Sequence, residues 1–134
     1  MTGPILIIED DPDIAEILSY SFETNDFKTR VALTGEEGLS ASLDERNPPS
    51  IILLDLLLPG MNGFELCRRL RSEALTRNTP IVLVTAKVFD KDIATAVELG
   101  IDDYIVKPFS VGDVVGRVSS LLQARQTQEA HVER

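Results

Sequence analysis

Polar residues that could do chemistry follow four short apolar runs of this 134-residue sequence. The first run ends in the acidic segment Glu9-Asp10-Asp11, and the three later runs end in Asp55, Thr85 and Lys107. Carboxylates that lie close together raise one another's pKa unless a cation lies among them, and oxygen ligands with room for water favour Mg²⁺. A carboxylate nucleophile, a metal, a lysine and a hydroxyl together favour phosphoryl transfer to an aspartate.

The apolar runs themselves predict the strands that would position these residues. The runs 5–8, 51–54, 81–84 and 104–106 alternate with longer amphipathic stretches, which is typical of a parallel α/β sheet. Continuous apolar runs fit strands that helices bury on both faces. The segment 27–33 alternates between apolar and polar residues instead, so we expect an edge strand there.

The stretches between the runs predict helices. The first has Asp11 as its N-cap, with Pro12 at the first helical position, and a capping-box spacing opens the second at Thr34. The third is expected over about 63–72 and the fourth over 90–99, before Gly100. The last has the clearest helical period, carried by Val111, Val114, Val115, Val118, Leu121 and Leu122.

Five strands and five helices in alternation predict an α/β three-layer sandwich. With right-handed crossovers, the five-stranded parallel sheet takes the flavodoxin-like, doubly wound order 2-1-3-4-5. The carboxyl ends of parallel strands share one edge, where open α/β folds bind ligands. An isolated aspartate after a strand is usually a cap or turn former. Four polar endings at equivalent places favour a shared site instead.

Composition limits the classes of function. The net charge of −9 argues against direct binding of nucleic acid or anionic membranes. Cys67 is the one cysteine, so no internal disulfide can form, and we find neither a signal peptide nor an apolar run long enough to cross a bilayer. We therefore expect a soluble, cytoplasmic protein, with one domain over 1–122 and a polar C-terminal tail or linker over 123–134.

Four sequence motifs resemble those of the receiver domains of bacterial two-component response regulators. They are ILIIEDD at 5–11, LDLLLPGMNG at 54–63, VTA at 84–86 and DYIVKPF at 103–109. The resemblance runs from about residue 4 to residue 122, with the motifs in the expected order and spacing. It implies the receiver fold and the function of a phosphorylation-dependent signalling switch.

The resemblance also implies a role for each site residue. Asp55 matches the phosphoacceptor, and Asp10 matches the direct ligand of a Mg²⁺ ion. Glu9 matches the acidic neighbour that acts on the metal through water, and the backbone carbonyl of Leu57 completes the protein ligands.

Three further residues match the machinery that reads the phosphoryl group. Thr85 and Lys107 match the residues that bind the phosphoryl oxygens, and Tyr104 matches the aromatic switch residue that turns inward as Thr85 moves. The resemblance further implies a cis peptide bond between Lys107 and Pro108.

The resemblance implies the partners as well. A sensor histidine kinase or phosphotransfer protein would supply the phosphoryl group, and the fourth helix, last strand and last helix would change to control an effector domain or protein. Such a domain catalyses its own phosphorylation and dephosphorylation and is otherwise not an enzyme. The chain is expected to be either a stand-alone receiver or part of a longer regulator.

The same output face resembles receivers that precede winged-helix DNA-binding domains and form homodimers through charged residues. Asp103, Asp113 and Arg117 match that pattern, whereas the basic residue expected near Ile93 is missing. A homodimer through this face and a merely solvated charged surface therefore both stay open.

Other classes of site fit less well. A haloacid-dehalogenase-type phosphatase needs a second aspartate two residues after the first, where this sequence has Leu57. A flavodoxin-like or Rossmann module needs a phosphate-binding loop after the first strand, where this sequence has the acidic segment 9–11. The remaining alternative is a degenerate receiver that acts as a phosphorylation-independent protein-interaction module.

Overall fold

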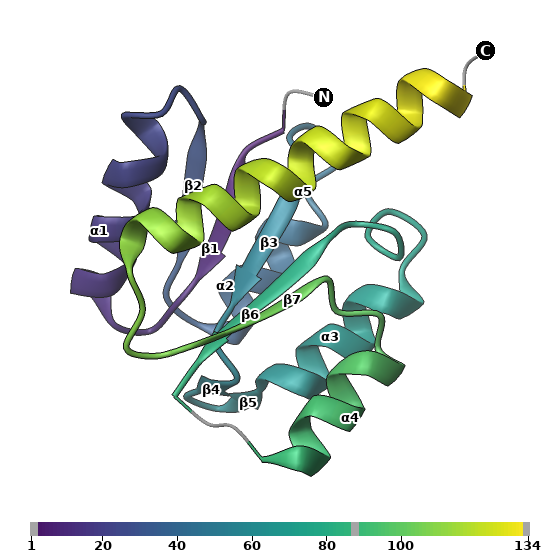
Figure 1. Ribbon diagram of the computed structural model, residues 1–134. Helices are drawn as coiled ribbons and strands as arrows, with labels where there is room; N and C mark the ends of the chain where they lie inside the picture. The colour runs from purple at the N-terminus through teal and green to yellow at the C-terminus, as the bar shows by residue number, and fades with distance from the viewer. Residues whose placement is uncertain (1–2, 87–88, 133–134) are drawn as a thin grey trace.

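A parallel five-stranded sheet forms the centre of the protein, in the order β2-β1-β3-β6-β7 (Figure 1). The computed structural model describes residues 3–86 and 89–132, with side chains through residue 125. The strands, in sheet order, are β2 (Thr29–Ala32), β1 (Ile5–Ile8), β3 (Ile51–Leu54), β6 (Ile81–Thr85) and β7 (Asp103–Val106). The predicted doubly wound fold and its strand order are therefore confirmed.

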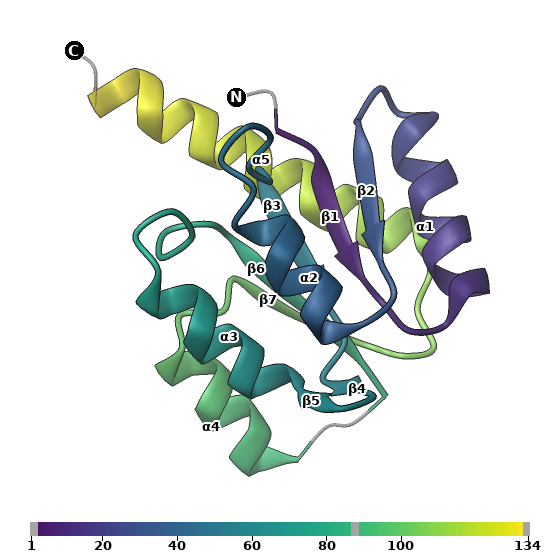
Figure 2. The same ribbon diagram turned by 180° about the vertical axis from the view of Figure 1, so that it is seen from behind.

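Helices cover both faces of the sheet and make three layers. One face carries α1 (Pro12–Glu23) and α5 (Val111–Val132); the other carries α2 (Gly35–Ser42), α3 (Gly63–Ser72) and α4 (Asp90–Glu98) (Figures 1 and 2). Alternate residues of one strand enter different cores: Ile5 and Ile7 pack on the α1/α5 side, whereas Leu6 and Ile8 pack on the other. Because both faces of the strand are buried, its sequence is apolar without interruption.

Local signals in the sequence set the helix ends. The Asp11 carboxylate accepts a hydrogen bond from the Asp13 amide at 2.9 Å, and the Thr34 hydroxyl accepts one from the Glu37 amide at 3.1 Å. After α4, Gly100 has a φ of 67°, in the left-handed region that favours glycine. These bonds satisfy backbone groups that the helices leave without partners inside the helix.

Two short elements differ from the prediction. β2 is an edge strand, as expected, but it spans only four residues of the predicted segment 27–33. Between β3 and α3 lies a small antiparallel hairpin that the sequence did not predict, formed by β4 (Leu57–Leu58) and β5 (Met61–Asn62). Two-residue strands are too short to show a period-2 pattern, so nothing in the sequence marked them.

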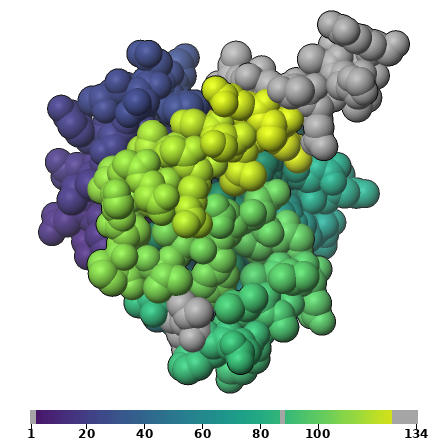
Figure 3. All heavy atoms as spheres, in the orientation of Figure 1, coloured from purple at the N-terminus to yellow at the C-terminus, as the bar shows by residue number. Residues whose placement is uncertain are grey.

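The last helix is longer than the apolar period indicated. α5 continues to Val132 through the region expected as a polar tail or linker, and its final turns extend past the sheet (Figure 1). The space-filling view shows the first part of α5 lying across this face of the protein (Figure 3). Within the described chain, no helix combines the length and hydropathy that crossing a membrane requires.

Candidate functional site

Hydrogen bonds of the sheet bring the predicted polar residues to one edge. Just past the ends of β1 and β3, the Asp55 amide donates to the Ile8 carbonyl at 3.1 Å. On the other side of β3, the Lys107 amide donates to the Thr85 carbonyl at 2.8 Å. Residues that are separated by up to about a hundred positions in sequence thus become neighbours, as the strand pattern predicted.

Three carboxylates gather at this edge. One oxygen atom from each of Glu9, Asp10 and Asp55 lies within 4.8 Å of the other two. Glu9 and Asp55 are only 3% and 5% exposed, whereas Asp10 is open to solvent. Buried carboxylates this close together need a cation, and the donor set is all oxygen with one exposed side, which fits a divalent ion that keeps bound water.

The ammonium group of Lys107 lies between the two buried carboxylates. Its Nζ is 2.8 Å from Glu9 Oε1 and 2.8 Å from Asp55 Oδ2. Burial acts to lower the pKa of Lys107, but the hydrogen bonds and charges of Asp55 and Glu9 outweigh it and hold that pKa above its usual value. Lys107 therefore stays charged and offsets part of the negative charge of the site.

Glu9 is held in place from two directions. Its second oxygen, Oε2, accepts a hydrogen bond from the Asp11 amide at 3.2 Å, while Oε1 faces Lys107. Burial raises the pKa of Glu9, and the bonds from Lys107 and Asp11 oppose that rise. A carboxylate in this environment needs a positive neighbour, because burial makes the loss of that neighbour costly.

The backbone around Asp55 fixes its carboxylate. Oδ1 accepts a hydrogen bond from the Leu57 amide at 2.9 Å, so the two oxygens of Asp55 have different partners. α3 begins at Gly63 immediately against this turn: a Cβ at that position would lie 2.6 Å from Leu56 Cα and 2.9 Å from the Asp55 carbonyl oxygen. Only glycine allows the helix to start so close to the strand end.

The two predicted switch residues lie on the neighbouring strands β6 and β7 and differ in burial. Thr85 ends β6 and is fully buried, whereas Tyr104 on β7 is half-buried. Burial, and then the negative charge of Asp92 on α4, raise the pKa of the Tyr104 hydroxyl. Tyr104 thus lies against the first turns of α4, on the α2/α3/α4 side of the sheet.

Comparison with known proteins identifies this arrangement. Residues 5–119 match the family described as the response regulator receiver domain. The chain belongs to this receiver family. Its curated relatives include the DNA-binding response regulator MtrA of Mycolicibacterium smegmatis, which is 39% identical over 132 residues, and the response regulator ArlR of Staphylococcus haemolyticus, which is 38% identical over 125 residues.

These alignments cover nearly all of this chain but only about half of each relative. The alignment with MtrA spans 98% of this chain and 56% of MtrA; that with ArlR spans 93% of this chain and 54% of ArlR. The chain therefore spans about half the length of the curated relatives it matches.

Solved structures with the same fold include a receiver domain protein and a response regulator. A CheY-like receiver domain protein from Methanospirillum hungatei superposes with a TM-score of 0.87 at 25% identity, over 96% of this chain and 99% of that one. DrrB, an OmpR/PhoB homologue from Thermotoga maritima, gives a TM-score of 0.80 at 29% identity, over 93% of this chain and 54% of that one.

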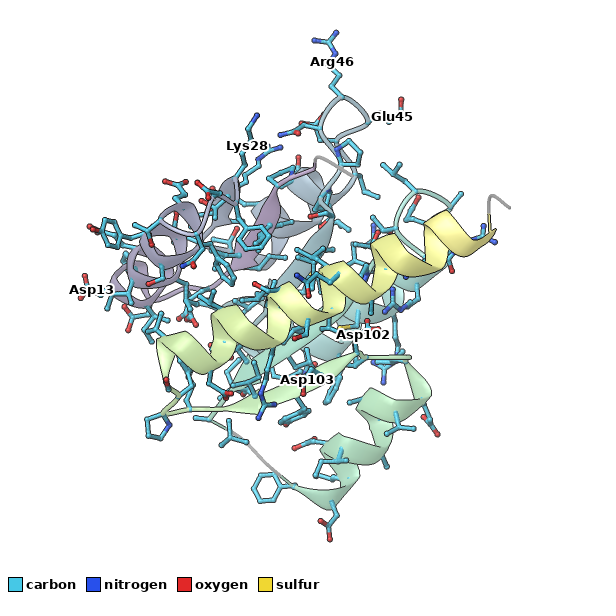
Figure 4. The ribbon with its side chains drawn as sticks, turned by 45° about the horizontal axis from the view of Figure 1, so that its top comes forward. Asp13, Lys28, Glu45, Arg46, Asp102 and Asp103 are labelled. Atoms are coloured by element: carbon cyan, nitrogen blue, oxygen red, sulfur yellow. The ribbon has the colours of Figure 1, made fainter. Side chains whose placement is uncertain are left out.

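The charged residues of the predicted output face pair within this receiver. The Arg117 guanidinium lies 3.1 Å from Asp103 and 3.2 Å from Asp113, so one cation joins β7 to α5. Figure 4 places Asp103 on β7 under α5. These contacts occupy, within one chain, the residues that the resemblance assigned to pairing between chains.

The sequence did not predict every contact of the site. The strand pattern predicted that five residues lie at one edge of the sheet, and the structure places them there: Glu9, Asp10, Asp55, Thr85 and Lys107. The sharing of Lys107 between two carboxylates was not predicted, because it depends on the reach of side chains. The Leu57 amide bonded to Asp55 was missed too, since a backbone donor leaves no trace in residue type. The Lys107–Pro108 peptide bond is cis, as the resemblance implied.

Proposed function

We propose that this receiver is a phosphorylation-dependent switch that accepts a phosphoryl group onto Asp55. The donor is a sensor histidine kinase or a phosphotransfer protein of a two-component system. The domain catalyses its own phosphorylation and dephosphorylation and has no other enzymatic role. Family membership over residues 5–119 supports the signalling class, and the geometry around Asp55 supports the choice of acceptor.

The observation that carries the proposal is the position of Lys107 between Asp55 and Glu9. An ammonium 2.8 Å from both carboxylates is a charge that can be shared differently once one carboxylate changes. A phosphoryl group on Asp55 brings more negative charge and three acceptor oxygens. Lys107 already contacts Asp55, so its two bonds would be redistributed toward such a group.

Mg²⁺ is the proposed cofactor. Asp10, Asp55 and the Leu57 carbonyl would hold it directly, and Glu9 through water. When bound, the ion offsets the charge of the carboxylates and of the incoming phosphoryl oxygens. The exposed Asp10 and the all-oxygen donor set support this choice of ion.

The residues of the chain itself account for the rest of the chemistry. A carboxylate oxygen of Asp55 attacks the phosphorus of a phosphohistidine, an O–P bond forms, and the N–P bond to the imidazole breaks. The Lys107 ammonium stabilises the phosphoryl oxygens as their charge develops, and the Thr85 hydroxyl donates a hydrogen bond to one of them. The catalysis is mostly positioning and electrostatics.

The response would leave through α4, β7 and α5. As Thr85 is drawn toward the phosphoryl group, Tyr104 turns into the space beside it, and a pre-existing equilibrium of this face shifts. The face would then control an effector domain or a partner protein. MtrA is a DNA-binding regulator, so a DNA-binding effector is the first kind to test; this chain, with a net charge of −9, is not expected to touch DNA itself.

The proposal is tested by intact mass after incubation with acetyl phosphate, in Mg²⁺ or in EDTA. Wild-type protein should gain one phosphoryl group in Mg²⁺ and none in EDTA, and Asp55→Ala should gain none. A wild-type protein that folds and binds Mg²⁺ but takes no phosphoryl group would instead be a phosphorylation-independent interaction module. An adduct that persists in Asp55→Ala would show that another residue is the acceptor.

A further inference from the structure

Arg71, on the last turn of α3, gathers backbone carbonyls at the edge of the sheet opposite the carboxylates. Its shortest hydrogen bonds run to the carbonyl oxygens of Thr79 at 2.7 Å, Leu99 at 2.9 Å and Gly100 at 3.0 Å. Longer bonds run to the carbonyls of Arg77 and Thr76, at 3.2 and 3.4 Å. A planar guanidinium can serve several acceptors in fixed directions, which a lysine cannot.

The carbonyls of Leu99 and Gly100 belong to the C-terminal end of α4. The last turn of α4 contains no basic residue that could interact favourably with its carbonyl end. Arg71 supplies that positive charge from the neighbouring helix, and Figures 1 and 2 show α3 and α4 side by side. The same side chain also bonds the 76–79 loop, so it ties three segments together.

Apart from this clamp, α4 is weakly attached to the sheet. Of the nine residues of α4, which the structure describes throughout, only Ala96 is buried. Alanine buries little apolar surface, so packing contributes little to holding the helix. Ile93 and Val97 are exposed, at 42% and 74%. At the C-terminal end, the hydrogen bonds of Arg71 add to the packing of Leu99 and Ile101 against the core.

At the N-terminal end of α4, no side chain of the described residues caps the first turn. Its N-cap is Phe89, which has no side-chain oxygen to cap the first turn. In that turn, Asp92 Oδ2 is buried yet has no hydrogen-bond partner in the described part of the chain. An unpaired buried oxygen is costly, so a rearrangement that gives it a partner is favoured. This end also lies against Tyr104.

We propose that Arg71 is a positioning residue of the switch, which fixes the C-terminal end of α4 so that α4 moves at its N-terminal end. The clamp itself is independent of phosphorylation. Only the trigger of the movement rests on the proposed function, through Thr85 and Tyr104. Asp102, whose carboxylate lies 4.0 Å from Arg71, marks the fixed end in Figure 4.

The first test uses ¹⁵N relaxation dispersion on the unphosphorylated full chain, which detects microsecond-to-millisecond exchange. The amides of Asp92 and Ile93 report the N-terminal end, and those of Leu99, Gly100 and Ile101 report the C-terminal end. Wild type should show exchange at the first pair and none at the second group. Arg71→Lys keeps the charge but not the fork, so exchange should spread to Leu99, Gly100 and Ile101.

The matched control is Arg30→Gln, which removes another arginine from an exposed ion pair, with Asp44, at the far side of the sheet. It should reproduce the wild-type pattern. Thermal unfolding of all three proteins separates the clamp from general weakening, because a merely structural Arg71 would lower the midpoint and leave the distribution of exchange along α4 unchanged. That result, or equal exchange at both ends in wild type, would overturn the proposal.

The second test repeats the comparison on protein phosphorylated with acetyl phosphate and Mg²⁺. Amide shifts should change at Asp92 and Ile93 and hardly at Leu99, Gly100 and Ile101 in wild type; in Arg71→Lys both ends should change. If wild type takes up no phosphoryl group, the proposed function fails while the first test still decides the clamp. If phosphorylation moves both ends equally in wild type, the clamp fails while the proposed function stands.

Discussion

Two cations lie at opposite edges of the same sheet, almost equally buried, and their nearest partners differ in kind. The side chain of Lys107 is 18% exposed and that of Arg71 is 19% exposed. Lys107 meets two side-chain carboxylates, Glu9 and Asp55, at one edge. Arg71 meets backbone carbonyls at the other.

The difference separates a site that can change from one that cannot. Carboxylates can bind metal, accept a phosphoryl group or turn away, so the partners of Lys107 are exchangeable. Backbone carbonyls at helix ends and in a tight loop move only with the chain, so the partners of Arg71 are fixed. The same kind of charge therefore supports chemistry at one edge and positioning at the other.

The largest expected effect is that of Lys107→Met on phosphorylation. Removing one preorganised donor from a site of this kind typically slows reaction about 100- to 1,000-fold. The rate of adduct formation with acetyl phosphate and Mg²⁺, followed by intact mass, should fall by that order. Lys28→Met is the matched control, because Lys28 is exposed at the opposite end of the sheet and points away from the protein in Figure 4. A wild-type rate in Lys107→Met would remove Lys107 from the chemistry.

Arg71→Met should instead weaken the fold and spare the chemistry. Losing several hydrogen bonds from a charged, largely buried group should cost about 2–3 kcal/mol in the free energy of unfolding, measured in urea. The rate of phosphorylation should stay within about threefold of wild type, because Arg71 touches none of the site carboxylates Glu9, Asp10 and Asp55.

Mg²⁺ sharpens the contrast between these two variants. In Lys107→Met the ion replaces the missing positive charge, so Mg²⁺ should recover part of the lost free energy of unfolding. In Arg71→Met it should recover no more than it adds to wild type. If Mg²⁺ stabilised both variants alike, the two edges would not differ as described.

Much of the first edge was predictable from the sequence, and almost nothing of the second was. Glu9, Asp55, Thr85 and Lys107 each follow an apolar run, and parallel strands bring such endings together whatever the details of packing. Arg71 follows Leu70 on an amphipathic helix, where an arginine usually means a solvated helix end. Its role depends on where two distant carbonyl groups lie, which residue types do not encode.

Asp92 and the hairpin show the same limit on prediction. Asp92 looks like an ordinary acidic residue in the first turn of a helix, a favourable place for it. Only the folded structure buries one of its oxygens and places its charge near Tyr104. The hairpin of β4 and β5 contains two residues per strand, so a pattern of alternation could not appear.

Two glycine substitutions extend the comparison to the backbone. Gly63→Ala would place a Cβ 2.6 Å from Leu56 Cα, so it should cost about 1–3 kcal/mol and also slow phosphorylation, since Asp55 belongs to the same turn. Gly116→Ala, on the exposed side of α5 with no atom within 4 Å of the new Cβ, should gain about 0.5–1 kcal/mol and leave the rate unchanged. Urea unfolding and intact mass measure both effects. Equal effects of the two substitutions would mean that the carboxylate edge is no tighter than the surface of α5.

The smallest effect concerns Asp92, whose buried Oδ2 atom pairs with neither Lys107 nor Arg71. Because its charge adds to burial in raising the pKa of Tyr104, Asp92→Asn should lower that pKa toward its usual value without reaching it, since burial is the larger cause and remains. Absorbance of the tyrosinate against pH measures the change in a Tyr20→Phe background, which leaves Tyr104 as the one tyrosine. Asp90→Asn, exposed in the same turn, is the control and should leave the titration in place. If Asp92→Asn left the pKa of Tyr104 unchanged, the Asp92 carboxylate would not face the tyrosine ring. The N-terminal end of α4 would then have no electrostatic link to the switch residue.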